Sequence, residues 1–151
     1  MNRILIRLRA PRTDDGAIIS LIRKELIPLS QTVHPRDAQT LRTLKKRLRN
    51  GSTIVAAKSK TAAPIGFIHY EIVSGIIHID LLAVHPDYRG FSIGRSLLAA
   101  AENDGRRSGC VLSRLFVDEG NEKAHRFYKR CGYTAAGYHA GLKCTEMIKP
   151  F

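Results

Sequence analysis

The sequence predicts a mixed α/β fold with a mainly antiparallel sheet of about seven strands flanked by about four helices. Four segments place apolar residues at helical spacing, and seven others show the short apolar or alternating runs that are typical of strands. Three of the strand segments follow one another with only short turns between them, which favours an antiparallel meander. Residues 76–117 then hold a strand, a helix and a strand, a length typical of a parallel pair joined by a right-handed crossover.

The first 50 residues predict a strand at 4–9 followed by two helices. Thr13-Asp14-Asp15 is typical of a helix start, and Pro28 is typical of a helix end. The second helix is expected over residues 37–49, before Asn50-Gly51. The side of the first helix that we expect to face the core carries Ile18, Leu21, Ile22 and Leu26.

Three strands are expected next, at residues 52–58, 65–73 and 76–84, with turns at 60–64 and at Ser74-Gly75.

The last third predicts two helices and three strands in alternation. A helix over residues 93–108 precedes a strand at 111–117, and a helix over 121–130 precedes strands at 133–138 and 143–148. The first of these helices is expected to bury Ile93, Leu97, Leu98 and Ala101.

The composition favours one domain over residues 1–151 and a cytoplasmic protein. A chain of 151 residues that is 44% hydrophobic suffices for one core and is short for two. Its apolar runs are far shorter than the ~20 residues of a membrane-spanning helix, and arginines interrupt the apolar start before a signal peptide could form. Cys110, Cys131 and Cys144 lack metal-ligand spacing, as do the histidines, so we expect three reduced core thiols and no metal.

The charge balance favours anionic partners without choosing among them. The net charge is +12, and the first 50 residues hold twelve basic against four acidic residues. Nucleic acid, an acidic membrane and a polyphosphate ligand all suit such a surface. The densest basic run, residues 42–49, carries Leu41, Leu44 and Leu48 at helical spacing, so its charges are expected to form the solvated face of a packed helix. It lacks the aromatic residues that single-stranded nucleic acid favours.

The segment RGFSIG, residues 89–94, lies between a predicted strand and a predicted helix. There, backbone N–H groups and the positive end of the helix dipole converge on a point that suits a phosphate. Gly90 and Gly94 allow close approach, and Arg89 and Arg95 add positive charge. The segment is neither a P-loop nor a dinucleotide-binding fingerprint, and an ordinary helix start is the alternative.

A second segment, NEKAHRFYKRCGY at residues 121–133, places two polar groups on one helix face. Tyr128 lies two turns beyond Asn121, with His125 between them. The alternative is a helix cap at Asn121 and a packed aromatic ring at Tyr128. The adjacent stripe, expected to be buried, consists of Ala124, Phe127 and Cys131.

Together these motifs resemble those of the GNAT superfamily of N-acetyltransferases. The acetyl-CoA motif of that family, [QR]-x-x-G-x-[GA] after a strand ending in a V-x-P-like turn, is similar to Val84-His85-Pro86 followed by residues 89–94. The family's N-x-x-A-x-x-F-Y-x-x-x-G-[FY] pattern is met at residues 121–133, and the resemblance spans nearly the whole chain. Ser92 stands where the family prefers glycine, so it either donates a hydrogen bond to the cofactor or weakens cofactor binding.

The resemblance implies acetyl-CoA as co-substrate, a primary amine as acceptor and no metal. The pantetheine arm would lie between the strands at 76–84 and 111–117, and the diphosphate would lie on the amides of residues 91–95. A backbone N–H near residues 82–84 would stabilise the oxyanion. The residues that the resemblance assigns to acetyl-CoA are Leu82, Ala83, Val84, Arg89, Gly90, Phe91, Ser92, Ile93, Gly94, Arg95, Ser96, Asn121 and Tyr128.

The resemblance also implies that the amine attacks the thioester directly and that Tyr128 protonates the departing thiolate. A phenol with a reference pKa of ~10 suits a thiolate of similar basicity. His78 and Asp80 alternate onto one strand face, where the resemblance puts a base that often acts through water. They are otherwise ordinary half-exposed strand residues; His69 and Glu71 on the neighbouring strand are less favoured candidates.

The acceptor is not identified by the sequence. By resemblance it is framed by residues 29–36 and 139–142, whose basic surroundings favour an acceptor with a carboxylate or phosphate, or a protein α-amine, over polyamines and aminoglycosides. The alternative function is a non-catalytic acetyl-CoA-binding protein or a basic nucleic-acid-associated module. Tyr128 together with Asn121 favours the enzyme, and nucleic acid and membrane partners are not expected. A homodimer is possible, since dimers are common among similar proteins.

Overall fold

The structure, a computed structural model, describes residues 3–29 and 38–151. In this part of the chain seven strands form one sheet in the order β1-β2-β3-β4-β5-β7-β6. All neighbours are antiparallel except β4 and β5, as the sequence predicts. The strands are β1 (Leu5–Leu8), β2 (Ser52–Ala57), β3 (Gly66–Val73), β4 (Ile76–Val84), β5 (Leu112–Asp118), β6 (Thr134–His139) and β7 (Cys144–Pro150).

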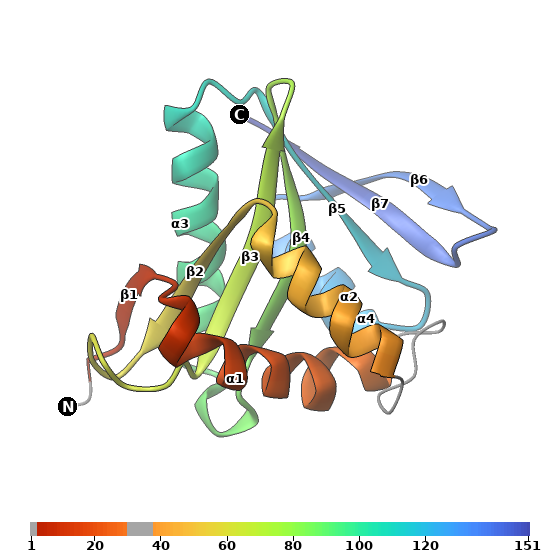
Figure 1. Cartoon of the computed structure of the whole chain (residues 1–151). Helices are drawn as coiled ribbons and strands as arrows, with labels where there is room; N and C mark the ends of the chain where they lie inside the picture. Colours follow the sequence, from red (N-terminus) through yellow and green to blue (C-terminus); the bar gives the residue numbers. More distant parts are fainter. Residues whose placement is uncertain (1–2, 30–37) are drawn as a thin grey trace.

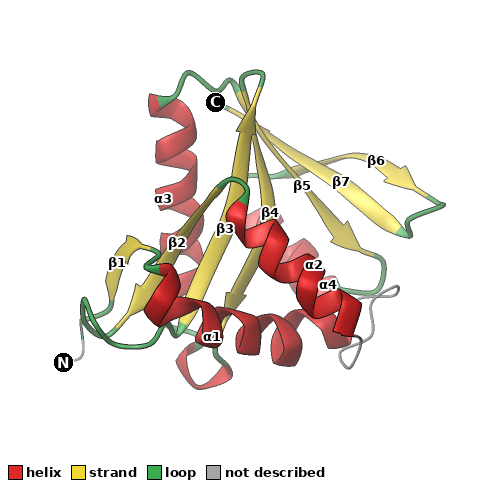
Figure 2. Cartoon of the chain, viewed as in Figure 1, coloured by secondary structure: helices red, strands yellow, loops and turns green. Residues whose placement is uncertain are grey.

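Helices cover both faces of the sheet (Figures 1 and 2). On one face, a cluster of buried residues joins the first two helices to β2, β3 and β4. On the other face, a larger cluster joins the last two helices to the sheet. The α-helices of the described residues are α1 (Pro11–Leu21), α2 (Ala38–Arg49), α3 (Ile93–Arg107) and α4 (Glu122–Arg130).

The first helix differs from the prediction at its start and in its second half. It begins at Pro11, because proline suits the first helical position, and not at Thr13-Asp14-Asp15. After Leu21 the helical path changes to a π-turn, η1 (Ile22–Leu26), and then to a 3₁₀ turn, η2 (Ile27–Leu29), which contains Pro28. Leu26 is partly buried against the same cluster as Ile18, Leu21 and Ile22, as predicted, and the π-turn adds Ile27, which is buried.

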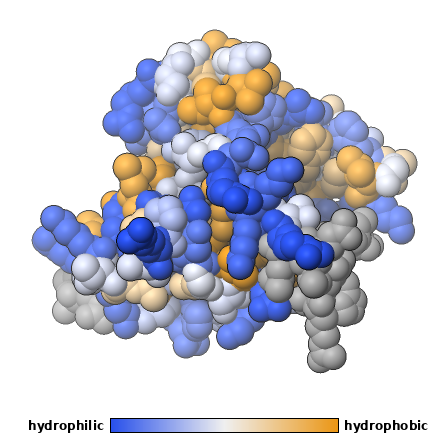
Figure 3. All heavy atoms as spheres, viewed as in Figure 1, coloured by the Kyte–Doolittle hydropathy of each residue, from blue (hydrophilic) through white to orange (hydrophobic). Residues whose placement is uncertain are grey.

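The second helix and the meander follow the prediction closely. Leu44 and Leu48 are buried on the side of α2 that faces the core. Asp37 and the Leu41 side chain lie outside the described residues. The basic residues of α2 form part of the hydrophilic face seen in Figure 3. At the β3–β4 turn, Ser74 and Gly75 both adopt positive φ, which suits a tight hairpin.

The sheet opens between β4 and β5, and this opening sets up the site. Only residues 76–78 of β4 pair with residues 112–114 of β5, and the two strands then diverge (Figure 1). On the other side of β4, one step from His69 to Tyr70 in β3 is matched by two steps in β4, so Asp80 is the extra residue of a β-bulge. A bulge bends its strand and increases its twist, which fits the divergence of β4 from β5.

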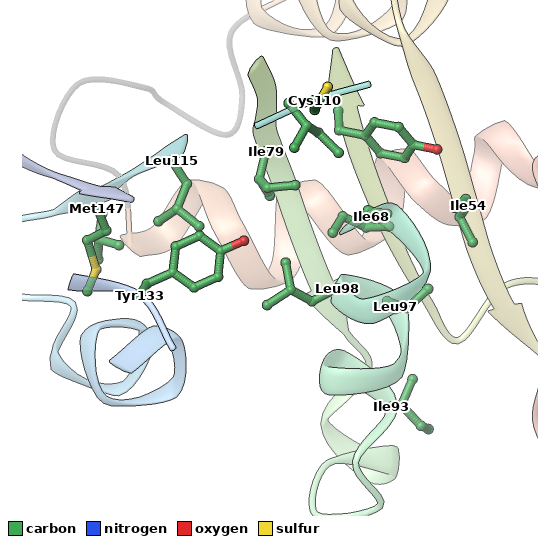
Figure 4. Packing of buried hydrophobic residues seen from close by; sticks show 14 of the residues in the cluster. Ile54, Ile68, Ile79, Ile93, Leu97, Leu98, Cys110, Leu115, Tyr133 and Met147 are labelled. Carbon is green, nitrogen blue, oxygen red and sulfur yellow. The ribbon is translucent and has the colours of Figure 1, made fainter. Parts of the chain in front are cut away.

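The core on the α3 side joins the two halves of the sheet. As predicted, α3 buries Ile93, Leu97, Leu98 and Ala101. Figure 4 shows Tyr133 between Leu98 of α3 and the strand residues Leu115 and Met147. The Tyr133 hydroxyl lies 2.6 Å from Glu102 Oε2 and 2.6 Å from Ser113 Oγ, so this buried group is well satisfied by hydrogen bonds.

The predicted buried stripe of α4 is only half-buried. Ala124, Phe127 and Cys131 all retain partial exposure, and none of the residues of α4 is fully buried. The reason is that α4 packs where β4 and β5 have separated, so the sheet offers it less surface (Figure 1). Cys110 and Cys144 are buried free thiols as expected, but Cys131 is not a core residue.

Candidate active site

The loop after β4 ends at a helix start that no side chain caps. A short 3₁₀ turn, η3 (Pro86–Tyr88), leads to Gly90, which adopts φ of 86°. Ser92 adopts φ of 60° and ψ of 22°, and its side chain accepts no capping hydrogen bond. The first-turn amides of α3 therefore remain open to an anion, as the RGFSIG motif predicts.

The left-handed backbone of Ser92 explains why glycine would suit this position. Left-handed conformation costs an L-residue with a Cβ roughly 1–2 kcal/mol. Part of this cost is offset by the higher entropy of a glycine in the unfolded chain. We predict that Ser92→Gly raises the free energy of unfolding by about 0.5 kcal/mol in urea titrations.

The matched control is Ser96→Gly, the same chemical change four residues later in regular α-helix. It should lower the free energy of unfolding by about 0.5–1 kcal/mol, since glycine is unfavourable inside a helix. Equal losses in the two variants would contradict the strain at Ser92.

The two arginines of the motif differ in their surroundings. Arg89 donates from Nη2 to Glu25 Oε2 at 2.6 Å and from Nε to the Val84 carbonyl at 3.3 Å. Arg95 is exposed and forms no ion pair with any residue that the structure describes. Arg95 is thus the motif's unpaired positive charge, whereas the charge of Arg89 is already balanced by a carboxylate.

The structure of α4 is compatible with both interpretations of the second motif, the polar helix face and the cap with a packed aromatic ring. Asn121 is the helix cap, and its side-chain oxygen accepts a hydrogen bond from the Ala124 amide at 3.3 Å. The half-buried Tyr128 ring makes edge contacts with Phe127 and Tyr133, with ring centroids 5.1 Å and 5.6 Å away. Its hydroxyl forms no hydrogen bond within the described residues. Burial, with a smaller contribution from Cys131, raises the pKa of Tyr128 above its usual range, so the phenol keeps its proton at neutral pH.

A pocket of about 360 Å³ lies between α2 and strands β3, β4 and β5. It brings His78 and Asp80 together, as their alternation predicts, and adds the two less favoured candidates from β3. Its lining consists of Arg47, Asn50, His69, Glu71, His78, Ile79, Asp80, Arg114 and Phe116.

The two expected base candidates have different environments in this pocket. Both carboxylate oxygens of Asp80 accept hydrogen bonds from Arg47, with Nε 2.7 Å from Oδ2, and this raises the pKa of Arg47. His78 is half-buried, and its side chain forms no hydrogen bond or ion pair with the described residues. The imidazole of His78 therefore has no bonded partner among the described residues, whereas the carboxylate of Asp80 is held by Arg47.

His69 is a buried neighbour of Asp80 and not an open base. It is 1% exposed, its Nδ1 lies 2.7 Å from the Thr53 hydroxyl, and its Nε2 lies 4.0 Å from Asp80 Oδ2. Burial lowers the pKa of His69, although Asp80 acts in the opposite direction. The ring is therefore neutral at pH 7.

The positions of several pocket residues could not be predicted from the sequence. Arg47 was expected on a solvated helix face, yet it reaches across to β4. Arg114 pairs with Glu146 of β7, and its guanidinium lies 5.0 Å from the centre of the Phe116 ring. No local pattern signals such contacts, because each joins residues more than 30 positions apart or depends on the side-by-side placement of β5 and β7.

The two segments expected to frame the acceptor are described unequally. Residues 30–36 lie outside the described residues. At the other segment, the His139 ring stands edge-on to Phe116 at 5.5 Å, which places the start of the last hairpin's turn beside the pocket.

The described residues contain neither a metal-binding cluster nor a membrane-spanning helix. No group of three or more His, Cys, Asp or Glu side chains is arranged to hold a metal ion. None of the helices in this part of the chain combines the length and the apolar character needed to cross a membrane.

Comparison with solved structures defines the class of fold. The PaiA N-acetyltransferase of Thermoplasma acidophilum, in complex with coenzyme A, superposes with a TM-score of 0.80 at 20% identity and covers 99% of both chains. Ard1 of Thermoplasma volcanium gives 0.76 at 21% identity over 97% of both chains. The chain therefore shares the fold of these two solved structures.

Sequence comparison defines the family. The model of the acetyltransferase (GNAT) family matches residues 19–133, and an IAA acetyltransferase of Azospirillum brasilense is 30% identical over 145 residues, or 91% of this chain and 88% of that protein. The chain therefore belongs to the GNAT family of acetyltransferases.

Other relatives match over shorter stretches. Aminoalkylphosphonate N-acetyltransferase of Salmonella typhimurium is 42% identical over 65 residues, which is 43% of this chain and 42% of that protein. An acetyltransferase of Agrobacterium fabrum is matched over 53% of its length. The chain thus spans about half the length of these curated relatives or less.

Proposed function

We propose that this protein is an N-acetyltransferase that moves an acetyl group from acetyl-CoA to a primary amine by direct attack. The observation that carries the proposal is the opening between β4 and β5, which has the uncapped start of α3 beside it. Family membership and the coenzyme A in a neighbour of the same fold support it. A cytoplasmic location, one domain over residues 1–151 and a possible homodimer remain predictions from the sequence.

The cofactor would follow the opened strand edge. From Ile79 onward β4 has no strand partner on its β5 side within the described residues, so backbone groups near residues 82–84 that point to that side would bind the pantetheine amides. The diphosphate would accept hydrogen bonds from the amides of residues 91–95, with Arg95 supplying charge. Asn121 and Tyr128 would contact the cofactor from α4.

The reaction then needs three groups around the thioester. The amine attacks the carbonyl carbon, and an N–H near residues 82–84 would stabilise the developing oxyanion. As the tetrahedral intermediate collapses, the C–S bond breaks and Tyr128 gives its proton to the thiolate. Freeing a lysine-like amine at pH 7 costs ~4.6 kcal/mol and an α-amine ~1.4 kcal/mol, so a base matters most for the former.

We assign the base to His78, acting directly or through a water, because its imidazole is unpartnered in the pocket. His78→Ala should lower kcat/KM at pH 7 by at least about 10-fold, and the deficit should shrink toward pH 9 as the free amine fraction rises.

Asp80→Asn should chiefly raise the KM for the acceptor, since it loosens Arg47 on the pocket wall. Measured pH–rate profiles of both variants check this. A pH-dependent deficit in Asp80→Asn alone would transfer the role to Asp80.

The pocket suits an acceptor that carries both an amine and an anionic group. Arg47 and Arg114 line it and each pairs with a carboxylate, so their remaining N–H groups would donate to the anionic group. The carboxylates of Glu71 and Asp80 would face the amine. The similarity to an aminoalkylphosphonate N-acetyltransferase supports the same class. A panel of amines assayed by CoA release should favour aminoalkylphosphonates or amino acids over spermidine. A clear preference for polyamines would contradict this assignment.

A further inference from the structure

Glu25 lies in η1, far from both motifs in the sequence, but its side chain contacts the RGFSIG motif. Its Oε2 accepts a hydrogen bond from Arg89 Nη2 at 2.6 Å across 64 positions of sequence. The carboxylate is mostly covered, with 17% side-chain exposure against 53% for Arg89. The π-turn that contains Glu25 packs above β4, where Ile22 and Ala83 share one buried cluster.

Arg89 connects three parts of the fold through its guanidinium. One arm reaches Glu25 in η1, and the other donates to the carbonyl of Val84 at the end of β4. The next residues, Gly90 and Ser92, both adopt positive φ before α3 begins. The backbone of the loop is therefore strained at Ser92, and the hydrogen bonds of the Arg89 side chain lie at the start of the loop.

We propose that Glu25 is a positioning residue for the diphosphate loop: it fixes Arg89 on the end of β4, so that the amides of residues 91–95 are preorganised for CoA. Since the Glu25 carboxylate balances the guanidinium charge, Arg89 holds the loop in place through its hydrogen bonds. Arg95 then supplies the positive charge that attracts the phosphates. This inference rests on the proposed binding of acetyl-CoA and adds a residue outside the motifs.

The test compares Glu25→Ala with Glu25→Gln in calorimetric titrations with CoA. Alanine removes the hydrogen-bond acceptor, so the CoA dissociation constant should rise about five-fold, the order expected for one exposed charge pair. Glutamine keeps an acceptor oxygen without the charge, so its dissociation constant should equal or fall below that of the unaltered protein. The KM for acetyl-CoA should follow the same order with kcat unchanged at saturation.

Asp15→Ala is the matched control, because it removes another arginine pair of the same helical segment, with Arg9, away from the loop. It should leave the CoA dissociation constant unchanged. Thermal unfolding without CoA shows whether each variant is folded. If Glu25→Ala is not folded, Arg89→Gln replaces it. Arg89→Gln should leave the salt dependence of CoA binding intact, whereas Arg95→Gln should reduce that dependence.

Tighter or unchanged CoA binding in Glu25→Ala, or equal weakening in both Glu25 variants, would overturn the positioning role. An unaltered protein that binds no CoA would instead overturn the proposed function itself.

Discussion

Tyr128→Phe should lower kcat by roughly 10²-fold or more and leave the dissociation constant of acetyl-CoA almost unchanged. The phenylalanine ring keeps the edge contacts with Phe127 and Tyr133 but cannot protonate the thiolate. Stability should also be unchanged, because the Tyr128 hydroxyl bonds to none of the described residues. Single-turnover kinetics and calorimetry measure the two quantities.

The pH dependence follows from the direction of the pKa shift. Because burial raises the pKa of Tyr128 above 10, the acid form persists through neutral and mildly alkaline pH. Activity should therefore not decline between pH 7 and 9.5 through loss of this proton. Tyr70→Phe is the contrasting variant: it removes a 2.6 Å hydrogen bond to Asp104 and should reduce stability without reducing kcat. Full activity in Tyr128→Phe would remove this residue from the mechanism.

Asp14→Asn should lower the free energy of unfolding by about 3 kcal/mol at pH 7. Asp14 is fully buried and accepts two hydrogen bonds from Arg7, at 2.7 Å and 3.0 Å, and one from the Ala10 amide at 2.7 Å. The amide variant leaves the Arg7 guanidinium buried without a counter-charge. Urea titrations of the two proteins give the difference.

Acid should remove the same stabilisation from the unaltered protein. Burial alone would raise the pKa of Asp14, but the hydrogen bonds from Arg7 and Ala10 outweigh it and hold the pKa below 3.8. The stabilisation is thus complete above about pH 4 and is lost as pH falls through the lowered pKa. Asp15→Asn, which affects a more exposed pair with Arg9, should cost no more than about 1 kcal/mol. A loss of similar size in both variants would contradict the burial argument.

Local patterns were sufficient for the order of elements. Leu97 and Leu98 point inward because helical spacing places them on the face that packs on the sheet, and the Ser74-Gly75 turn follows from residues that tolerate positive φ. The start of α3 at Ile93 also follows from sequence, but the absence of a cap from Ser92 does not, since serine is a favoured helix cap.

Features that depend on distant partners could not be predicted in this way. The bulge at Asp80 is set by pairing with β3, and the π-turn at Ile22–Leu26 by packing on β4. Periodicity therefore missed the buried Ile27, although it correctly placed Leu26 on the core side. The partners of Asp80 and Arg89 likewise come from elements 33 and 64 residues away, where charge alone indicates no pairing.

The central claim is that the loop before α3 binds the diphosphate of acetyl-CoA. The most direct measurement is a calorimetric comparison of acetyl-CoA with acetyl-pantetheine, which has the same thioester and no diphosphate. We expect one acetyl-CoA per chain, an affinity that falls with salt, and binding of acetyl-pantetheine at least about 100-fold weaker. Equal affinities for the two compounds, or no heat with acetyl-CoA, would contradict the claim.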